Sequence, residues 1–253
     1  MPVGFPLSRR ALLLGAVATP VLAARPDPLR GLVEPHMRLA PSADPLGAPR
    51  VALTLDACDG AADLRILRVL EDEAIPATIF VTGIWLRRNP EVFRRLLARP
   101  DLFEIGDHGA HHHAAIDRPE RLWGVVQAAG SPEAIAAEVT VGADLIETAG
   151  APRPKWYRGA AAFYSPQALG QIVTLGYRIA GFSLNADGGA SFGTQETAAR
   201  IARARDGDVL IAHVNQPHRP SGAGVVEGVR ALKGRGVRFV RLSDPDVTVI
   251  PAA

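Results

Sequence analysis

Short apolar runs alternate with longer amphipathic stretches along most of the chain, from about residue 50 onward. Each run is only long enough for one strand, and most are too uniformly apolar for a strand with a solvated face. They are typical of strands buried on both faces. Seven strands are predicted, at Val51–Ala57, Ala77–Thr82, Leu102–Asp107, Trp156–Ala160, Tyr177–Leu184, Asp208–Val214 and Val237–Leu242.

The stretches between these runs repeat their apolar residues at helical spacing. Two of them open with Ser followed by Pro, at Ser131-Pro132 and Ser165-Pro166. This is the pattern of an N-cap followed by Pro at the first helical position. Helices are predicted at Asp63–Glu73, Pro90–Ala98, Pro132–Ala149, Pro166–Leu175, Gln195–Ala204 and Gly224–Lys233.

Strands that alternate with crossover helices favour a parallel sheet, here a barrel-like β/α architecture. In such folds catalytic groups collect at the carboxyl ends of the strands. Polar residues lie at or just beyond five of the predicted strand ends: Asp56 and Asp59, Asp107 and His108, Arg158, Asn185 and Asp187, and His213 and Asn215. We therefore expect these side chains to share one rim of the barrel.

The N-terminal residues 1–24 have the pattern of a twin-arginine export signal. Arg9-Arg10 precedes an apolar run, Ala11–Val21, that is too short to span a bilayer, and small residues follow it. The alternatives are a membrane anchor and an ordinary helix. Removal after Ala23 would leave basic and acidic residues in equal number, which argues against a nucleic-acid partner. With one cysteine, the chain forms no internal disulfide.

The rest of the chain divides at about residue 50. Residues 25–49 are rich in Pro and lack periodicity, so they are predicted to form an extended lead-in along the domain surface. The 253-residue chain is 47% hydrophobic, enough for one large domain or two small ones. Residues 50–253 are predicted to form the catalytic domain.

Four of the seven histidines lie within six residues, at His108, His111, His112 and His113. Histidine is the commonest metal ligand in proteins. If the segment after Gly106 forms a helix, His108 and His112 lie one turn apart and both rings can face one ion. The alternative is a solvated polyhistidine loop.

Five short motifs resemble, in order, those of the polysaccharide deacetylases, the carbohydrate esterase family 4 enzymes with a NodB homology domain. Thr54-Leu55-Asp56-Ala57 resembles the first motif, Thr-Phe-Asp-Asp, and His108 with His112, after Glu104-Ile105-Gly106, resembles the second, His-x-x-x-His. Arg158 matches the Arg of the third motif. Asn185-Ala186-Asp187 resembles the fourth, an Asp-containing loop, and Leu210-Ile211-Ala212-His213 resembles the fifth, Leu-x-x-His. The resemblance covers about Arg50 to Ser243. It implies a distorted (β/α)7 barrel of the NodB type that binds a divalent metal, most simply Zn²⁺, with Co²⁺ or Ni²⁺ as alternatives.

The resemblance also implies a role for each matching residue. Asp56 would be the general base, kept ionised by Arg158. His213 would be the general acid, oriented by Asp187. His108 and His112 would hold the metal ion, which lowers the pKa of bound water and polarises the acetyl carbonyl.

The chain departs from the first motif where the family has its metal-binding second Asp, because Ala57 stands there. A third metal ligand must then come from elsewhere. We favour Asp59, a hard carboxylate that the turn at Gly60 can direct inward, over Cys58 and Asp56.

Substrate contacts are expected from four residues. The third motif lacks the family's Pro-Tyr, so Tyr164 or Phe163 would supply an aromatic wall, and Trp156 is the tryptophan best placed to stack on a sugar. Asn185 and Asn215 are candidates for polar contacts at the rim.

These features predict a metal-dependent hydrolase that removes N-acetyl groups from a polysaccharide or peptidoglycan in the periplasm or outside the cell. One alternative is a degenerate barrel that binds glycans without turnover, which Ala57 favours. Another is a metal-free glycosidase, which needs two facing carboxylates, and Asp56 with Asp187 is the only evident pair.

Overall fold

The computed structural model describes residues 1, 29–42 and 47–251, and its centre is a curved parallel sheet. The sheet order is β8, β7, β4, β3, β2, β10, β9, and β11 also pairs with β2. The bounds are β2 Arg50–Ala57, β3 Ala77–Val81, β4 Phe103–Asp107, β7 Trp156–Tyr157, β8 Arg178–Ile179, β9 Leu184–Asn185, β10 Val209–His213 and β11 Arg238–Val240. Among the described residues, the two end strands β8 and β9 do not pair with each other, so the barrel is open. The predicted distorted β/α barrel is confirmed.

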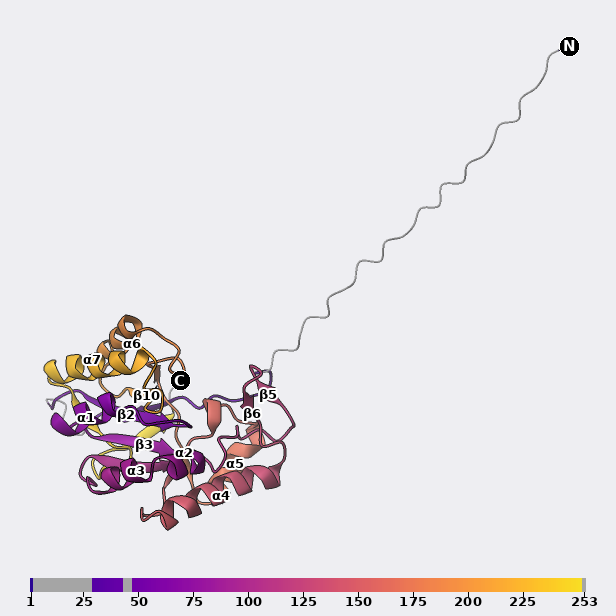
Figure 1. Cartoon of the computed structure of the whole chain (residues 1–253), viewed down its shortest axis with the longest axis horizontal. Helices are drawn as coiled ribbons and strands as arrows, with labels where there is room; N and C mark the ends of the chain where they lie inside the picture. The colour runs from indigo at the N-terminus through magenta and orange to yellow at the C-terminus, as the bar shows by residue number, and fades with distance from the viewer. Residues whose placement is uncertain (2–28, 43–46, 252–253) are drawn as a thin grey trace.

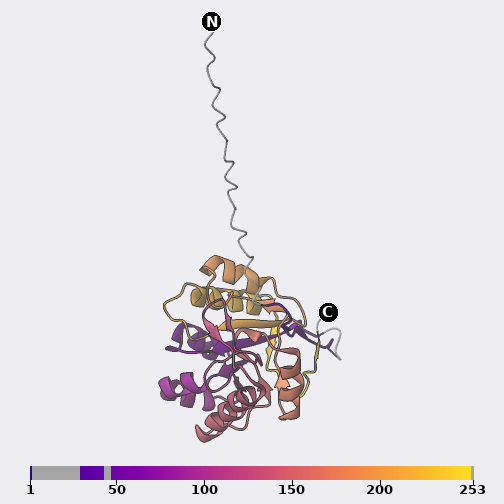
Figure 2. The ribbon, with the colours of Figure 1, turned by 90° about the vertical axis from the view of Figure 1, so that its right-hand side faces the viewer.

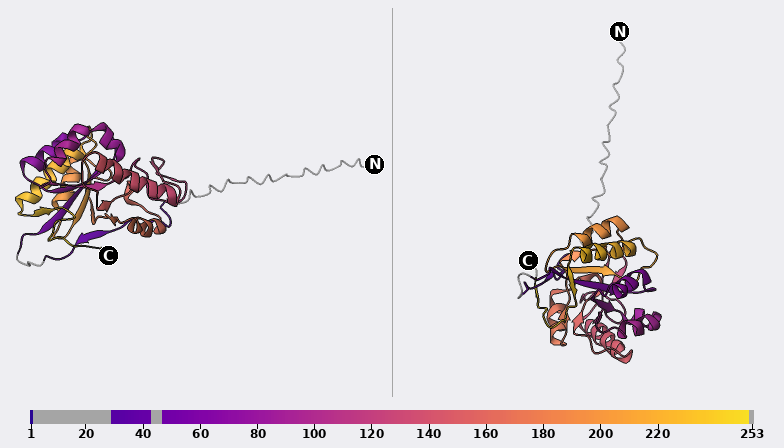
Figure 3. Two further views of the ribbon diagram at one scale, coloured as in Figure 1. Left: turned by 90° about the horizontal axis from the view of Figure 1, so that it is seen from below. Right: turned by 90° about the vertical axis from the view of Figure 1, so that its left-hand side faces the viewer.

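Helices surround the sheet, as the views in Figures 1, 2 and 3 show together. They are α1 Leu64–Asp72, α2 Gly83–Arg88, α3 Pro90–Leu97, α4 Pro132–Thr148, α5 Pro166–Thr174, α6 Thr194–Ala202 and α7 Ser221–Gly234. Every residue of β2 and β3 is buried, which explains why their sequences are almost continuously apolar. The arrows of these two strands point toward the end of the molecule where a hairpin, β5 Arg121–Leu122 and β6 Val126–Gln127, lies (Figure 1).

Helix α2 was not predicted from the sequence because it is short and begins with Gly83. Its N-cap is Thr82, whose hydroxyl accepts a hydrogen bond from the backbone N–H of Trp85 at 2.9 Å. The predicted cap of α4 is present, since Ser131 Oγ accepts from Ala134 N at 3.2 Å. Ser165 precedes α5 but makes no cap bond, because its hydroxyl accepts from the backbone N–H of Asp117 and donates to the Asp117 carboxylate.

The predicted single strand at residues 177–184 is two strands, β8 and β9, on opposite edges of the sheet. The chain bends between them where the lead-in crosses it. A Cβ added at Gly181 would lie 2.1 Å from the carbonyl oxygen of Pro35, so only glycine fits this crossing. One apolar run in the sequence can therefore form strands at both edges of the sheet, and hydrophobic periodicity does not show where the run divides.

The described part of the lead-in is paired with the domain. Strand β1, Met37–Leu39, pairs antiparallel with β12, Val249–Pro251, and both Met37 and Leu39 are buried. The predicted export signal lies outside the described residues, apart from Met1. Across the described residues, none of the helices combines the length and the apolar character needed to cross a bilayer.

Candidate acid-base and metal site

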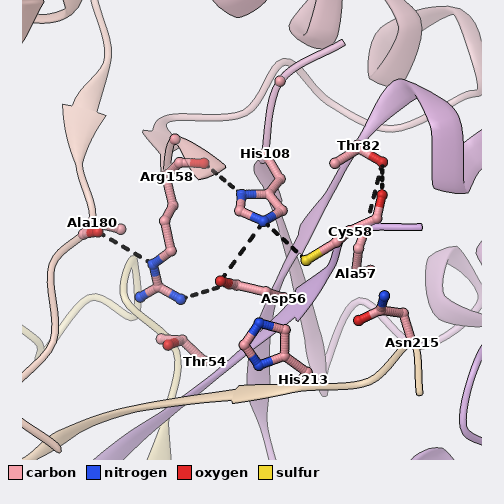
Figure 4. Close-up of polar contacts among 12 residues, drawn as sticks. Thr54, Asp56, Ala57, Cys58, Thr82, His108, Arg158, Ala180, His213 and Asn215 are labelled. Atoms are coloured by element: carbon pink, nitrogen blue, oxygen red, sulfur yellow. Dashed lines mark hydrogen bonds and ion pairs between the residues drawn. The ribbon is translucent and has the colours of Figure 1, made fainter. Parts of the chain in front are cut away.

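Asp56 and His213 lie at the ends of two neighbouring strands. Asp56 is the last residue but one of β2, His213 is the last residue of β10, and the two are register partners. Parallel strands lie about 4.8 Å apart, and register partners project to the same face of the sheet. Both side chains therefore face one space, as Figure 4 shows. The fold brings together the two residues expected to act as base and acid.

The Asp56 carboxylate is buried and is held by Arg158. Nη1 of Arg158 donates to Asp56 Oδ1 at 2.8 Å, and the guanidinium lies over the ring of Phe80 at 4.4 Å from its centroid. Burial alone would raise the pKa of Asp56, but the positive charges of Arg158 and His108 outweigh it, so the pKa is lowered. The other carboxylate oxygen, Oδ2, lies 3.8 Å from Nε2 of His108.

The ring of Phe80 on β3 lies so close to its register partner on β4, Gly106, that only glycine fits there. A Cβ at this position would lie 2.5 Å from the Phe80 ring. The Glu-Ile-Gly sequence before the histidine segment thus has a packing reason, because it admits the ring that supports Arg158.

His213 is held by a carboxylate of its own. The side chain of Asp187, which is fully buried, accepts a hydrogen bond from the backbone N–H of His213 at 2.7 Å and lies 3.0 Å from its Nδ1. Burial alone would lower the pKa of His213, but the Asp187 carboxylate raises it well above its ordinary value. With Nδ1–H bonded to Asp187, Nε2 is the ring nitrogen left to exchange a proton.

The histidine segment after β4 is a loop and not the helix that its spacing suggested. We call residues 108–113 the histidine loop; none of them is helical. Gly109 has φ +87° and His112 has φ +61°, and these left-handed conformations belong to a loop that brings the rings of His108 and His112 to 5.0 Å between centroids. The structure thus brings the two rings together by a route other than a helical turn.

His108 is oriented by a backbone group. Its Nδ1 lies 2.6 Å from the carbonyl oxygen of Arg158, so Nδ1–H donates there and the lone pair of Nε2 is left for the space beside Asp56. A metal-binding histidine commonly has such a partner on its other ring nitrogen.

Glu138 of α4 anchors the histidine loop, and the sequence analysis did not single it out. The carboxylate is 3% exposed and accepts from the backbone N–H groups of His111 at 2.8 Å and His113 at 3.0 Å. It also lies 3.1 Å from Nδ1 of His111. An acidic residue on the otherwise apolar buried face of α4 was the available signal, because such a buried charge needs partners. His111 and His113 thus contact the anchor, while His108 and His112 face each other.

Cys58, and not Asp59, lies beside the two histidines. Sγ of Cys58 is 3.4 Å from Nε2 of His108, and the ligand atoms of Cys58, His108 and His112 all lie within 4.8 Å of one another. The side chain of Asp59 is 56% exposed and pairs with Arg88 at 2.7 Å. The expectation that Asp59 supplies the third ligand is therefore corrected by the geometry.

Strand alternation explains this arrangement. Successive side chains of a strand point to opposite faces, so Asp56 and Cys58 share the side that faces the site, while Ala57 is buried in the apolar core. Asp59 lies beyond the strand, where the turn at Gly60 directs it to solvent. Alanine at position 57 thus suits the apolar core that surrounds it.

The donor set fits a divalent transition metal. Burial alone would raise the pKa of the Cys58 thiol, but His112 and His108 lower it. The net pKa lies well below the ordinary value of a thiol. Burial lowers the pKa of His108, but Asp56 and Cys58 raise it to about 9, so a bound metal ion must displace a proton from this ring. One sulfur and two imidazole nitrogens are ligands that Zn²⁺ accepts. Within the described residues this is the one such convergence of ligand atoms.

The four residues expected to contact substrate lie in different surroundings. Trp156 is 2% exposed and its indole N–H donates to Ser243, and Tyr164 is fully buried with its hydroxyl accepting from Gly159 N. Neither offers a surface for a sugar. Asn185 is exposed, but its side chain accepts from the backbone of Gly188.

Asn215 is the member of this group that lies next to the site (Figure 4). Its amide nitrogen donates to the carbonyl oxygen of Asp59, and its buried side-chain oxygen has no hydrogen-bond partner among the described residues. The exposed tryptophan of the described chain is Trp123, at the tip of the β5–β6 hairpin, with its ring against Phe163.

The fold and site define a parallel β/α barrel with a carboxylate–imidazole pair beside a candidate metal site. A family model described as polysaccharide deacetylase matches residues 43–180, more than half of the chain. The chain therefore belongs to the polysaccharide deacetylase family. The matched residues include Asp56, Cys58, His108, His112 and Arg158, whereas Asp187 and His213 lie beyond them.

Solved structures similar to this chain agree with the family. A family 4 carbohydrate esterase from Streptomyces lividans, in complex with acetate, is 18% identical with a TM-score of 0.63, over 81% of this chain and 98% of that one. The peptidoglycan deacetylase PdaC from Bacillus subtilis is 23% identical with a TM-score of 0.63, over 79% of this chain and 91% of that one. A pseudoenzyme of the same esterase family from Bacillus anthracis is 17% identical with a TM-score of 0.63, over 79% and 66%. At these identities the likeness shows the fold alone, and no curated protein matches the sequence.

Proposed function

We propose that this polysaccharide deacetylase is a metal-dependent hydrolase that removes N-acetyl groups from a polysaccharide or from peptidoglycan outside the cytoplasm. His108 and His112 hold the ion, together with a third donor from the segment that follows β2. The observation that carries the proposal is the register pairing of Asp56 with His213, each fixed by a partner of opposite charge, beside the two histidine rings.

Each half of the pair has the charge state that its step needs. Asp56 is ionised, so it can take a proton from the water that attacks the acetyl carbonyl carbon. His213 carries a proton, so it can give it to the nitrogen as the carbon–nitrogen bond breaks, and acetate and a free amine result. A divalent ion bound at the histidines would supply Lewis acidity at the carbonyl.

The positioning groups act through the acid and the base. Arg158 leaves only one carboxylate oxygen of Asp56 free to face a water molecule, and Asp187 fixes the ring orientation of His213. Because the two partners carry opposite charges, Arg158 lowers the pKa of Asp56 and Asp187 raises that of His213, so the base and the acid keep separate roles.

The class of substrate and the location are proposed from different observations. Two of the similar structures are named as a carbohydrate esterase and a peptidoglycan deacetylase, and residues 1–24 have the pattern of an export signal. Peptidoglycan and exported polysaccharides are N-acetylated polymers that such a protein would meet.

The test is acetate release from N-acetylated oligosaccharides and from peptidoglycan fragments. We expect release by the Zn²⁺-loaded protein, loss of most activity after chelation, and recovery when Zn²⁺ is added back. Full activity in metal-free protein would contradict the metal dependence. Oligosaccharide binding without acetate release by the loaded protein would favour a glycan-binding barrel.

A further inference from the structure

We propose that the third protein ligand of the metal is the thiolate of Cys58, so that this site is selective for thiophilic ions such as Zn²⁺, Co²⁺ and Cd²⁺ over Mg²⁺, Ca²⁺ and Mn²⁺. This inference rests on the metal-dependent function proposed above and adds the identity of the third ligand. Its test measures how the ion is bound and not the release of acetate.

The distances support a shared ion. Zn–S bonds are about 2.3 Å long and Zn–N bonds about 2.0–2.1 Å, which in a tetrahedron puts neighbouring ligand atoms about 3.5 Å apart. Sγ of Cys58 lies 3.4 Å from Nε2 of His108, and the three ligand atoms lie within 4.8 Å of one another. The triad is therefore close to the size that one ion requires.

Two of the three ligands are positioned by groups outside the cluster, and the third has a constrained backbone conformation. The carbonyl oxygen of Cys58 accepts from the hydroxyl of Thr82, the residue that also caps α2. His108 is oriented through its Nδ1 by the backbone of Arg158, and His112 is held in a left-handed conformation. Such strain in a non-glycine residue costs about 1–3 kcal/mol and persists where the surrounding structure imposes it.

The carboxylates near the cluster are less well placed than the thiol. Asp59 pairs with Arg88 at the surface. Asp56 has Oδ1 bound to Arg158 and Oδ2 3.8 Å from Nε2 of His108, farther than Sγ of Cys58 at 3.4 Å. Sulfur is thus the third donor that the geometry offers. Because thiolates prefer Zn²⁺ and Co²⁺ whereas carboxylates suit Mg²⁺, Ca²⁺ and Mn²⁺, a donor set with one sulfur and two nitrogens shifts ion selection toward the first group.

The experiment uses Co²⁺ as a spectroscopic probe in the full chain. A thiolate bound to Co²⁺ gives a charge-transfer absorption band in the near ultraviolet, which oxygen and nitrogen ligands alone do not give. We expect this band in the unaltered protein and in Asp59→Asn, the matched control at the neighbouring position. Cys58→Ser should lack the band and bind Zn²⁺ more than about 100-fold more weakly, since even loss of an indirect partner weakens metal binding about 10–100-fold.

Cys58→Asp provides the conservative replacement. It should lack the band, bind Co²⁺ more tightly than Cys58→Ser, and bind Mn²⁺ better relative to Zn²⁺ than the unaltered protein does. Circular dichroism of the variants checks that the fold is kept. A band that persists in Cys58→Ser, or is absent from the Co²⁺-loaded unaltered protein, overturns the proposal.

The two proposals fail in different ways. If the band is present and depends on Cys58 while no acetate is released, the thiolate ligand stands and the deacetylase function falls. If acetate release depends on metal while the band is missing, the function stands and Cys58 is not a ligand. Metal-free activity that thiol alkylation abolishes would make Cys58 a nucleophile and overturn the ligand role.

Discussion

The site has two regions that are built in different ways. The strand-held pair, Asp56 and His213, is placed by the register of β2 and β10, and each member has a buried partner of opposite charge. The histidine loop lies beyond β4, has left-handed residues at Gly109 and His112, and is held by the carboxylate of Glu138 and by Asp107, which accepts from Gly109 N. Strand register fixes the proposed acid and base through the backbone bonds of the sheet, whereas the proposed metal ligand His112 lies in a loop that fewer contacts hold.

This difference predicts which substitutions affect the reaction and which affect the binding of metal. A substitution in the strand-held pair should affect the reaction more than the position of the backbone, because hydrogen bonds of the sheet remain. A substitution at the loop anchor should affect the binding of metal more than the acid-base step. Three variants test this division, from the largest expected effect on activity to the smallest.

Asp56→Asn should have the largest effect, because it removes the proposed base. Loss of a general base lowers kcat by about 10²–10⁴-fold. It also leaves the buried charge of Arg158 without its ionic partner, a change that can cost about 3–5 kcal/mol of stability when one member of a buried pair is removed. Steady-state kinetics and thermal unfolding measure the two effects, and the protein should still bind the ion. A kcat within tenfold of the unaltered value would remove Asp56 from the role of base.

Asp187→Asn should lower kcat by about 10²-fold, the lower end of the range for general acid-base catalysis, since His213 remains but is less well oriented. Its pH profile gives the sharper readout. The Asp187 carboxylate raises the pKa of His213, so activity should fall as the pH rises through that pKa and the proton is lost. Without the carboxylate the pKa is lower, and the alkaline limb of kcat should move to lower pH. An unchanged limb would show that another group donates the proton.

Glu138→Gln should have the smallest effect on kcat at saturating metal and a clear effect on metal binding. The variant weakens the anchor of the histidine loop, so we expect the affinity for Zn²⁺ to fall about 10-fold, as for other partners behind a ligand. Hydrogen exchange of the amides at residues 109–113 should also become faster. Glu147→Gln, in the same helix but exposed and paired with Arg153, is the matched control. Equal affinities in the two variants would refute the role of Glu138 as anchor.

Much of the fold was predictable because buried parallel strands and amphipathic helices leave periodic patterns. The predicted ends of β2, β3 and β10 agree with the structure within one or two residues, since each run is bounded by polar residues. The run at 177–184 was misleading because it divides near Gly181, where the carbonyl of Pro35, distant in the sequence, leaves no room for a side chain. Contacts of this kind leave no periodic signal.

The site was predictable to the extent that strands position it. Strand ends indicated that Asp56, Arg158 and His213 share a rim, and the structure brings them to one rim. Asp59 was misplaced because the turn at Gly60 was expected to direct its carboxylate inward, whereas that carboxylate is exposed and pairs with Arg88. The Cys58 side chain, two residues after Asp56, points inward instead. Trp156 and Tyr164 were expected at the surface because aromatic side chains suit sugars, yet both fill the core.

The pairing of β1 with β12 has a practical consequence for recombinant work. The two strands join segments from near the two ends of the described chain, and Met37 and Leu39 fill part of the core cluster that contains Trp156, Phe182 and Val209. A shortened gene that starts at residue 43, where the family match begins, would delete β1 and uncover this cluster. Expression designs should therefore keep the chain from residue 33 or earlier, so that the backbone bonds between Val33 and Tyr164 are kept as well.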